Sequence, residues 1–154
     1  MYPWLVAEVA SGEVTEIAGY IYASRFATRA AYDWSVESSL YIGQQHTRLG
    51  IGRAMYEQLL AILKKQNLRM VYAGIALPNE PSVGLHEAMG FTKVANFDKA
   101  GYKFGGWHDV GWWALDLHPE FDHGVHEVIP FEDCLLYTSP SPRDATLSRM
   151  PSSA

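Results

Sequence analysis

The sequence contains a single cysteine, Cys134, among its 154 residues. One thiol excludes both an internal disulfide and a metal site built from several thiolates, and this scarcity is typical of proteins in a reducing cytoplasm. Long apolar runs are also missing, and none approaches the roughly 20 residues that a membrane-spanning helix needs. The first residues lack the basic segment of a signal peptide, and Glu8 interrupts their apolar run. We therefore expect a cytoplasmic protein with no membrane partner.

Basic residues are too few for a general nucleic-acid-binding surface. The chain has 12 Lys and Arg against 17 Asp and Glu, a net charge of −5, and no basic stripe. Three histidines, His118, His123 and His126, lie near Glu120 and Asp122, but their spacing matches no known metal site. We expect neither nucleic acid nor a metal as a ligand. The remaining composition, 48% hydrophobic and 19% charged residues, is typical of one globular domain with a core.

Strand and helix patterns alternate over the first 117 residues. They predict strands at residues 4–9, 17–23, 32–42, 69–77, 92–104 and 107–117, a helix at 50–66, and a short helix that follows the break at 78–81 and ends at 88. The helix at 50–66 is the clearest of these elements. Its apolar residues recur at steps of three and four, which places on one face Ile51, Met55, Leu59, Ile62 and Leu63.

Residues 40–54 read as a strand, a short polar turn and the start of that helix, with glycines at positions 50 and 52. The N-terminus of a helix carries partial positive charge and amide donors that lack partners, so it favours an anion. Gly50 and Gly52 have no Cβ and let an anion approach the backbone closely. We interpret this stretch as an anion site, with the pyrophosphate of coenzyme A as the candidate ligand.

Four blocks of sequence in order, residues 29–39, 46–52, 77–91 and 101–113, resemble the GNAT superfamily of N-acetyltransferases. Within it they are similar to the phosphinothricin N-acetyltransferase family, which also acetylates methionine sulfoximine. The resemblance runs from about residue 4 to 117. It implies an α/β fold with a mixed, mostly antiparallel sheet and packed helices in residues 1–118. It also implies transfer of an acetyl group from acetyl-CoA to the primary amine of a small amino-acid analogue.

The chain departs from the family pattern in two places. Thr47 stands where the superfamily has Gln or Arg, three residues before the first glycine, and we expect weakened binding of the anion. The family also has a strand and two helices before the segment that resembles residues 4–9, so we expect an N-terminally truncated domain that lacks them. Two other readings stay open: an acyl-CoA-binding remnant without catalysis, and a truncated reading frame without function.

The resemblance implies two catalytic residues. An amine must be neutral to attack a thioester, and Glu37, on the strand that enters the turn, is the candidate base. The alternative for Glu37 is an ordinary exposed carboxylate. His86 is the candidate acid for the departing thiolate, since an imidazolium can act as an acid near neutral pH. The alternative for His86 is simple packing on the short helix.

The resemblance also implies two sets of binding residues. The residues expected to bind acetyl-CoA are Leu40, Tyr41, Ile42, Arg48, Leu49, Gly50, Ile51, Gly52, Arg53 and Asn79. An ordinary turn is the alternative for Asn79. The residues expected to bind the acidic groups of the acceptor are Arg29, Tyr32 and Lys103, because arginine suits carboxylate and phosphinate groups. By the same resemblance we expect a homodimer, with residues 102–113 near its interface.

The composition changes after residue 118. Residues 119–154 have no periodicity and become rich in Ser, Pro and Arg, which predicts a disordered tail. Within that tail, residues 134–154 resemble a translated sequencing adapter. We therefore expect them to be non-native and leave them out of the functional interpretation.

Overall fold

The computed structural model describes residues 2–120, 124–135 and 147–148. Within them the strands form a sheet in the order β5-β6-β4-β3-β2-β1-β7. The strands are β1 (Trp4–Ser11), β2 (Val14–Arg25), β3 (Ser35–Ile42), β4 (Met70–Ala76), β5 (Thr92–Lys103), β6 (Gly106–Asp116) and β7 (Leu147–Ser148). The α-helices are α1 (Ile51–Lys65), α2 (Glu80–Ala88) and α3 (Phe131–Leu135). Neighbouring strands are antiparallel except β3 and β4, so the expected mixed, mostly antiparallel α/β fold is confirmed.

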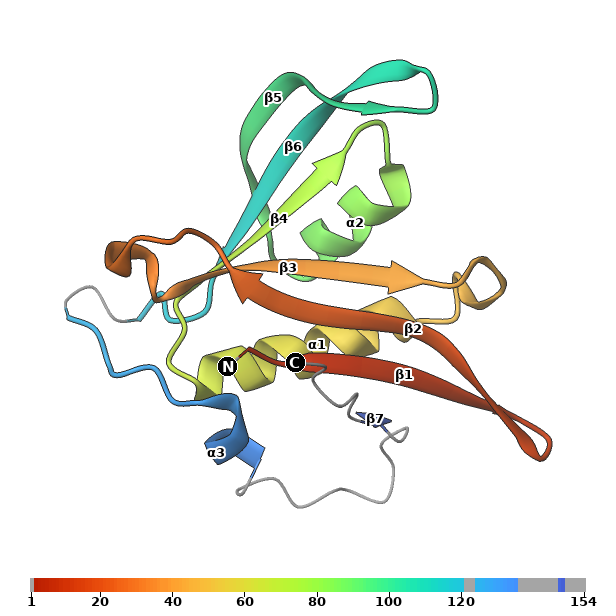
Figure 1. The fold of residues 1–154 in the computed structure, drawn as a ribbon, viewed down its shortest axis with the longest axis horizontal. Coiled ribbons are helices and arrows are strands. Elements are labelled where there is room, and N and C mark those ends of the chain that lie inside the picture. The colour runs from red at the N-terminus through yellow and green to blue at the C-terminus, as the bar shows by residue number, and fades with distance from the viewer. Residues whose placement is uncertain (1, 121–123, 136–146, 149–154) are drawn as a thin grey trace.

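The parallel strands β3 and β4 stay together over only three residue pairs. Ser35 pairs with Met70, Val36 with Val71 and Glu37 with Tyr72, and no later pair joins the two strands. Figure 1 shows the consequence, because β4, β6 and β5 turn away from the layer formed by β3, β2 and β1. The sheet therefore opens at its centre, between β3 and β4 (Figure 1).

Helix α1 packs across β1, β2 and β3 (Figure 1). Its buried residues are Met55, Tyr56, Leu59 and Leu63. All five members of the predicted apolar stripe thus face the core, since Ile51 and Ile62 also pack against it while partly buried, and Tyr56 joins them. The helix is followed by Asn67 at φ 62°, a left-handed conformation that asparagine tolerates after a helix. None of the helices within the described ranges is long and apolar enough to cross a lipid bilayer.

The strand boundaries differ from the predicted ones at two turns. Residue 32 was predicted to begin the third strand, but Tyr32 closes a 3-10 turn over Ala30–Tyr32 and β3 begins at Ser35. The hairpin between β5 and β6 turns on Phe104 and Gly105, which both have positive φ, rather than on residues 105 and 106. Two positive φ values are typical of the tight turns that match the twist of a hairpin.

Residues 124–135 pack against the end of α1. The main chain of Ile129 donates to the carbonyl of Gln66 at 3.0 Å, and the Gln66 side chain donates to the carbonyl of Ile129 at 3.0 Å. Phe131 and Cys134 are buried in this segment. The predicted disorder is therefore wrong for residues 124–135, because these apolar side chains find a surface that composition does not reveal. The predictions for residues 121–123, 136–146 and 149–154 lie outside the described residues, and the non-native origin of 134–154 stays a prediction.

Candidate active site

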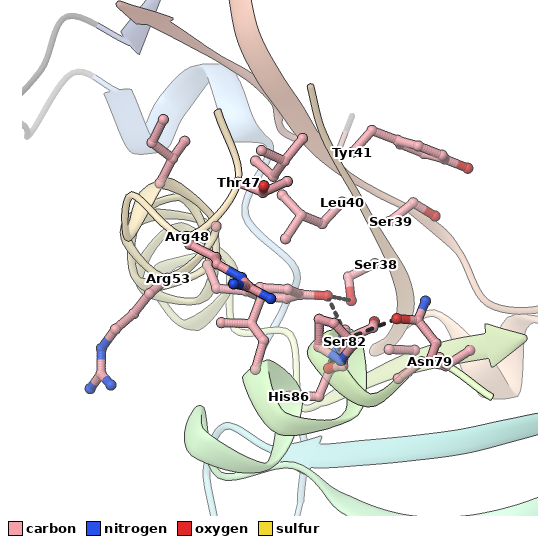
Figure 2. A pocket seen from close by; sticks show the side chains of 18 of the residues that line it. Ser38, Ser39, Leu40, Tyr41, Thr47, Arg48, Arg53, Asn79, Ser82 and His86 are labelled. Carbon is pink, nitrogen blue, oxygen red and sulfur yellow. Dashed lines mark hydrogen bonds between the residues drawn. The ribbon is translucent and has the colours of Figure 1, made fainter. Parts of the chain in front are cut away.

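A cavity of about 680 Å³ fills the gap between β3 and β4. It is lined by residues 38–42 of β3, by residues 73–76 of β4, and by the loop and first turns of α1. The start of α2 completes the wall with Asn79, Pro81, Ser82, Leu85 and His86. Figure 2 shows the residues from Ser38 to Tyr41 on one side and Asn79, Ser82 and His86 on another. The cavity thus gathers side chains that lie up to 48 residues apart in the sequence.

Most of the residues predicted to bind acetyl-CoA line this cavity. They are Leu40, Tyr41, Ile42, Arg48, Gly50, Ile51, Gly52, Arg53 and Asn79. Leu49 does not line it and is 64% exposed. His86 lies in the wall, whereas Glu37 and the predicted acceptor residues do not. The lining residues that sequence reasoning missed include Ser38, His46 and Tyr56.

The loop before α1 presents backbone amides to the cavity. Arg48 and Gly50 both adopt left-handed conformations, with φ of 62° and 76°, and Gly50 caps the helix without any side-chain hydrogen bond. The first amides of α1 therefore keep their capacity to bind an anion. Gly52 also has a packing role, because a Cβ there would lie 3.2 Å from the side chain of Leu40 and 3.2 Å from that of Leu85. Its absent side chain lets α1 pack closely against β3 and α2.

The charges around the cavity also favour an anion. Among the described residues that line it, Arg48 and Arg53 are cationic and none is acidic. Arg53 points outward and pairs with Glu57 at 3.0 Å (Figure 2). The hydroxyl of Thr47 donates to the carbonyl of Gln44 at 3.0 Å, so it closes the loop instead of reaching for a ligand. The candidate groups for binding an anion are therefore the backbone amides at the start of α1 and the cation of Arg48.

Asn79 caps α2 and also faces the cavity. Its Oδ1 accepts a hydrogen bond from the main chain of Ser82 at 3.2 Å. The cap uses the oxygen of the side chain, so the amide nitrogen remains available as a donor toward the cavity. The two interpretations of Asn79, a helix cap and a ligand-binding amide, are therefore compatible.

His86 is buried at the closed end of the cavity. Its Nδ1 lies 2.7 Å from the carbonyl oxygen of Ser82, and its Nε2 lies 2.7 Å from the hydroxyl of Tyr56. That hydroxyl is also 3.0 Å from the hydroxyl of Ser38 on β3. Figure 2 draws these hydrogen bonds as a chain from Ser38 to His86.

Burial disfavours the charged forms of the two titratable side chains in this series of hydrogen bonds, His86 and Tyr56. It lowers the pKa of His86 below its ordinary value of 6.5, although the Ser82 carbonyl opposes the shift. It raises the pKa of Tyr56 to about 12, and the hydrogen bond with Ser38 opposes that shift. In the resting protein His86 is therefore mainly neutral at pH 7, which is not the imidazolium that the predicted acid role needs.

Glu37 occupies the last pair that joins β3 to β4, beside the point where the cavity begins. Its neighbours Val36 and Ser38 are buried toward α1, so Glu37 points to the other face of the sheet. Desolvation raises the pKa of its half-buried carboxyl. Glu37 is thus a carboxylate with raised proton affinity at the edge of the gap.

The three residues predicted to bind the acceptor substrate do not form one site within the chain. Arg29 is exposed and precedes the 3-10 turn, and Tyr32 contacts the ring of Phe26 at 6.2 Å between centroids. Phe26 in turn stacks on Tyr72, the partner of Glu37, at 4.4 Å. Lys103 lies at the end of β5, over the ring of Phe104. Tyr32 therefore connects to the face of Glu37 through aromatic rings, whereas Lys103 lies at the tip of a hairpin.

The sequence matches the family model described as acetyltransferase (GNAT) domain over residues 2–112. A phosphinothricin N-acetyltransferase from Streptomyces viridochromogenes is 50% identical over 116 residues, which cover 75% of this chain and 61% of that protein. An L-methionine sulfoximine/L-methionine sulfone acetyltransferase from Salmonella typhimurium is 33% identical, with 75% of this chain and 66% of that protein covered.

Solved structures give the same result. The crystal structure of a GNAT superfamily phosphinothricin acetyltransferase from Sinorhizobium meliloti, in complex with AcCoA, superposes with a TM-score of 0.75 and 31% identity. It covers 84% of this chain and 69% of that one. The chain spans less than two thirds of the Streptomyces viridochromogenes relative. Since the family model spans most of the sequence and includes the open sheet, the chain belongs to the GNAT acetyltransferase domain family.

Proposed function

We propose that this chain transfers an acetyl group from acetyl-CoA to the primary amine of a small amino-acid analogue of the phosphinothricin or methionine sulfoximine type. The observation that carries the proposal is that β3 and β4 separate directly after Glu37, where the cavity begins. A thioester that lies in this gap would meet a base on one side and the buried hydroxyls on the other. The names of the similar proteins support the choice of acceptor.

Acetyl-CoA is the proposed cosubstrate. The free amides at the start of α1 and the cation of Arg48 suit its pyrophosphate. The strand edges at residues 38–42 and 73–76 carry unpaired backbone groups along the gap, and these suit the amides of the pantetheine arm. The bound AcCoA of the Sinorhizobium meliloti structure supports this assignment.

Glu37 is the proposed base. The acceptor's ammonium group must lose a proton before its nitrogen attacks the thioester carbonyl. Burial raises the proton affinity of the Glu37 carboxylate toward the range that such a transfer needs. His86 is proposed to act on the departing thiolate from the side of the gap where Ser38 and Tyr56 lie, and Tyr32 and Arg29 to bind the acceptor from the aromatic face.

A homodimer is also proposed. The tip of the β5–β6 hairpin exposes Tyr102, Phe104 and Trp107 to 64%, 93% and 65%. Such a group of exposed rings favours a contact with another protein surface. Lys103 lies in this tip, so a dimer would bring it toward the site of the second copy. Light scattering of the purified chain, with Phe104→Ser as the disrupted variant, tests the dimer.

Two measurements test the proposed function in order. Millimolar acetyl-CoA should raise the melting temperature, since a ligand at 100 times its Kd adds about 2.7 kcal/mol to the free energy of unfolding. Detection of free thiol in the presence of phosphinothricin or methionine sulfoximine should then show turnover. No thermal shift would reject every form of acetyl-CoA binding, and a shift without turnover would identify a binding remnant.

The role of Glu37 has its own test. Glu37→Gln should lower kcat by roughly 10² to 10⁴ and leave the Kd for CoA unchanged, because the residue lies outside the cofactor cavity. Glu13→Gln, in the exposed turn between β1 and β2, is the matched control and should change neither value. A loss of CoA affinity in Glu37→Gln at unchanged kcat would reject the role of base.

A further inference from the structure

We propose that Tyr56 is a positioning residue of the acetyl transfer, whose hydroxyl donates to the unprotonated Nε2 of His86 and favours the neutral ring with its proton on Nδ1. The inference rests on the proposed function and adds a residue to it. Tyr56 lies on α1, His86 on α2 and Ser38 on β3, so their hydrogen bonds join three elements at the closed end of the cavity.

The tautomer follows from the partners of the two ring nitrogens. The oxygen of Ser82 that lies 2.7 Å from Nδ1 belongs to a carbonyl and can only accept. Nδ1 must therefore donate, and in the neutral ring Nε2 has no proton. The hydroxyl of Tyr56, 2.7 Å from Nε2, is then the donor of that hydrogen bond.

The same proton also sets the preferred direction of the next hydrogen bond. The proton of Tyr56 is used on His86, so the hydroxyl of Ser38 donates to the oxygen of Tyr56 at 3.0 Å. The carbonyl of Tyr72, at 3.3 Å, is the alternative acceptor for Ser38. A donor on its oxygen polarises the Tyr56 hydroxyl and strengthens the hydrogen bond that it gives to His86.

Packing holds both rings in these orientations. Tyr56 is completely buried and His86 is 5% exposed. Their ring centroids lie 5.0 Å apart, and the ring of Phe91 contacts both edge to face, at 5.7 Å and 5.2 Å. Phe91 thus restrains the rings without any hydrogen bond to either, which makes it a control site for packing alone.

The charge of His86 depends on few neighbours. The polar groups that face the ring are Tyr56 from α1 and Ser82 from its own helix, and Glu87 instead accepts from the indole of Trp113. A hydrogen bond given to the neutral form acts in the same direction as burial.

The test measures the histidine directly. Nitrogen NMR of the full-length chain, with His86→Gln to assign the signal, should find the Nδ1–H tautomer in the unaltered protein. Tyr56→Phe removes the donor and should raise the pKa of His86 by roughly 0.5 to 1. In the same variant the limb of the kcat profile that belongs to His86 should move to higher pH by the same amount.

The control variant is Phe91→Leu, which alters the packing of the same rings. It should lower the melting temperature but leave the tautomer and the titration of His86 unchanged. If Tyr56→Phe behaves like Phe91→Leu, Tyr56 is only a structural residue and the proposal is wrong. An Nε2–H tautomer in the unaltered protein would overturn it as well, even if Tyr56→Phe fails to fold. Absent turnover in the unaltered protein would reject the proposed function, whereas the NMR signals would still show whether Tyr56 sets the state of His86.

Discussion

At the scale of single residues, environment rather than residue type decides the chemistry. Glu37 and Glu13 are both strand or turn carboxylates in the sequence, but only Glu37 is half buried beside the gap. Desolvation raises its pKa, and a carboxyl whose pKa is higher in the folded state than in the unfolded one destabilises the fold once it ionises.

The stability of Glu37→Gln should therefore depend on pH. Below the ordinary glutamate pKa of 4.5 both states are protonated, and the variant and the parent should unfold at the same temperature. As pH rises through the raised pKa, the parent loses stability that the variant keeps, so Glu37→Gln should be the more stable protein at pH 7. Thermal unfolding at pH 4 and pH 7 measures this, and a less stable variant at pH 7 would contradict the raised pKa.

At the scale of elements, the ends of the two helices form the site. The start of α1 offers amides that no side chain caps, whereas the start of α2 is capped by Asn79. The two ends thus differ, since the backbone amides of one are free to bind an anion and the other holds the side chain of Asn79 in place.

Variants of Asn79 should separate its role as a helix cap from its role as a hydrogen-bond donor to the ligand. Asn79→Ala should cost about 1 kcal/mol in the free energy of unfolding and also weaken the binding of acetyl-CoA. Asn79→Asp keeps a good cap and should retain that stability, but it loses the amide donor and adds a negative charge beside an anionic ligand. Chemical denaturation and calorimetry measure the two effects. Equal CoA affinity in the parent and Asn79→Asp would show that the residue is a cap alone.

The conformation of Gly50, directly before α1, also belongs to the scale of elements. Gly50 has φ 76°, and a side chain in the left-handed conformation costs roughly 1 to 2 kcal/mol. Gly50→Ala should therefore destabilise the protein by about that amount and also disturb the anion site, as denaturation and CoA titration will show. Gly50→Asn is the control, because asparagine tolerates this conformation and should recover most of the loss. An alanine variant as stable as the parent would contradict the assigned strain.

At the scale of the whole molecule, residues 124–135 join the folded domain by packing against the end of α1. Residues 124–135 bind the end of α1 through Gln66 and Asn67, and Phe131 is 6% exposed. The indole of Trp34 also donates to the carbonyl of His126, which ties the same segment to the loop before β3. The segment therefore links parts of the fold that lie about 60 to 90 residues away in sequence.

Phe131→Ala should lower the free energy of unfolding by about 3 kcal/mol, the lower end of the range for a buried phenylalanine. Val125→Ala, in the same segment but 63% exposed, should leave it nearly unchanged. Urea denaturation of both variants gives the comparison. If the two variants have the same free energy of unfolding, residues 124–135 do not contribute to the stability of the folded domain.

Local patterns were enough to predict most of the elements. The step of three and four along α1 follows from helical geometry, and the breaks at Gly12 and at residues 78–81 follow from glycine and proline chemistry. The anion site before α1 could be predicted for the same reason, because it uses consecutive residues. The predictions failed where long-range contacts decide, as at Tyr32 and in residues 124–135.

The sequence by itself therefore determined helices α1 and α2, strands β1 to β6, the loop of amides at Gly50 and the family. Only the tertiary structure decided which polar groups of the site form hydrogen bonds with one another. Tyr56 and His86 lie 30 residues apart, and Ser38 lies 18 residues before Tyr56, so no local pattern reveals that their polar atoms meet. A buried hydroxyl must find a partner, but the sequence does not say which one, because the partner is chosen by the packing of α1 and α2 against a sheet that opens after Glu37.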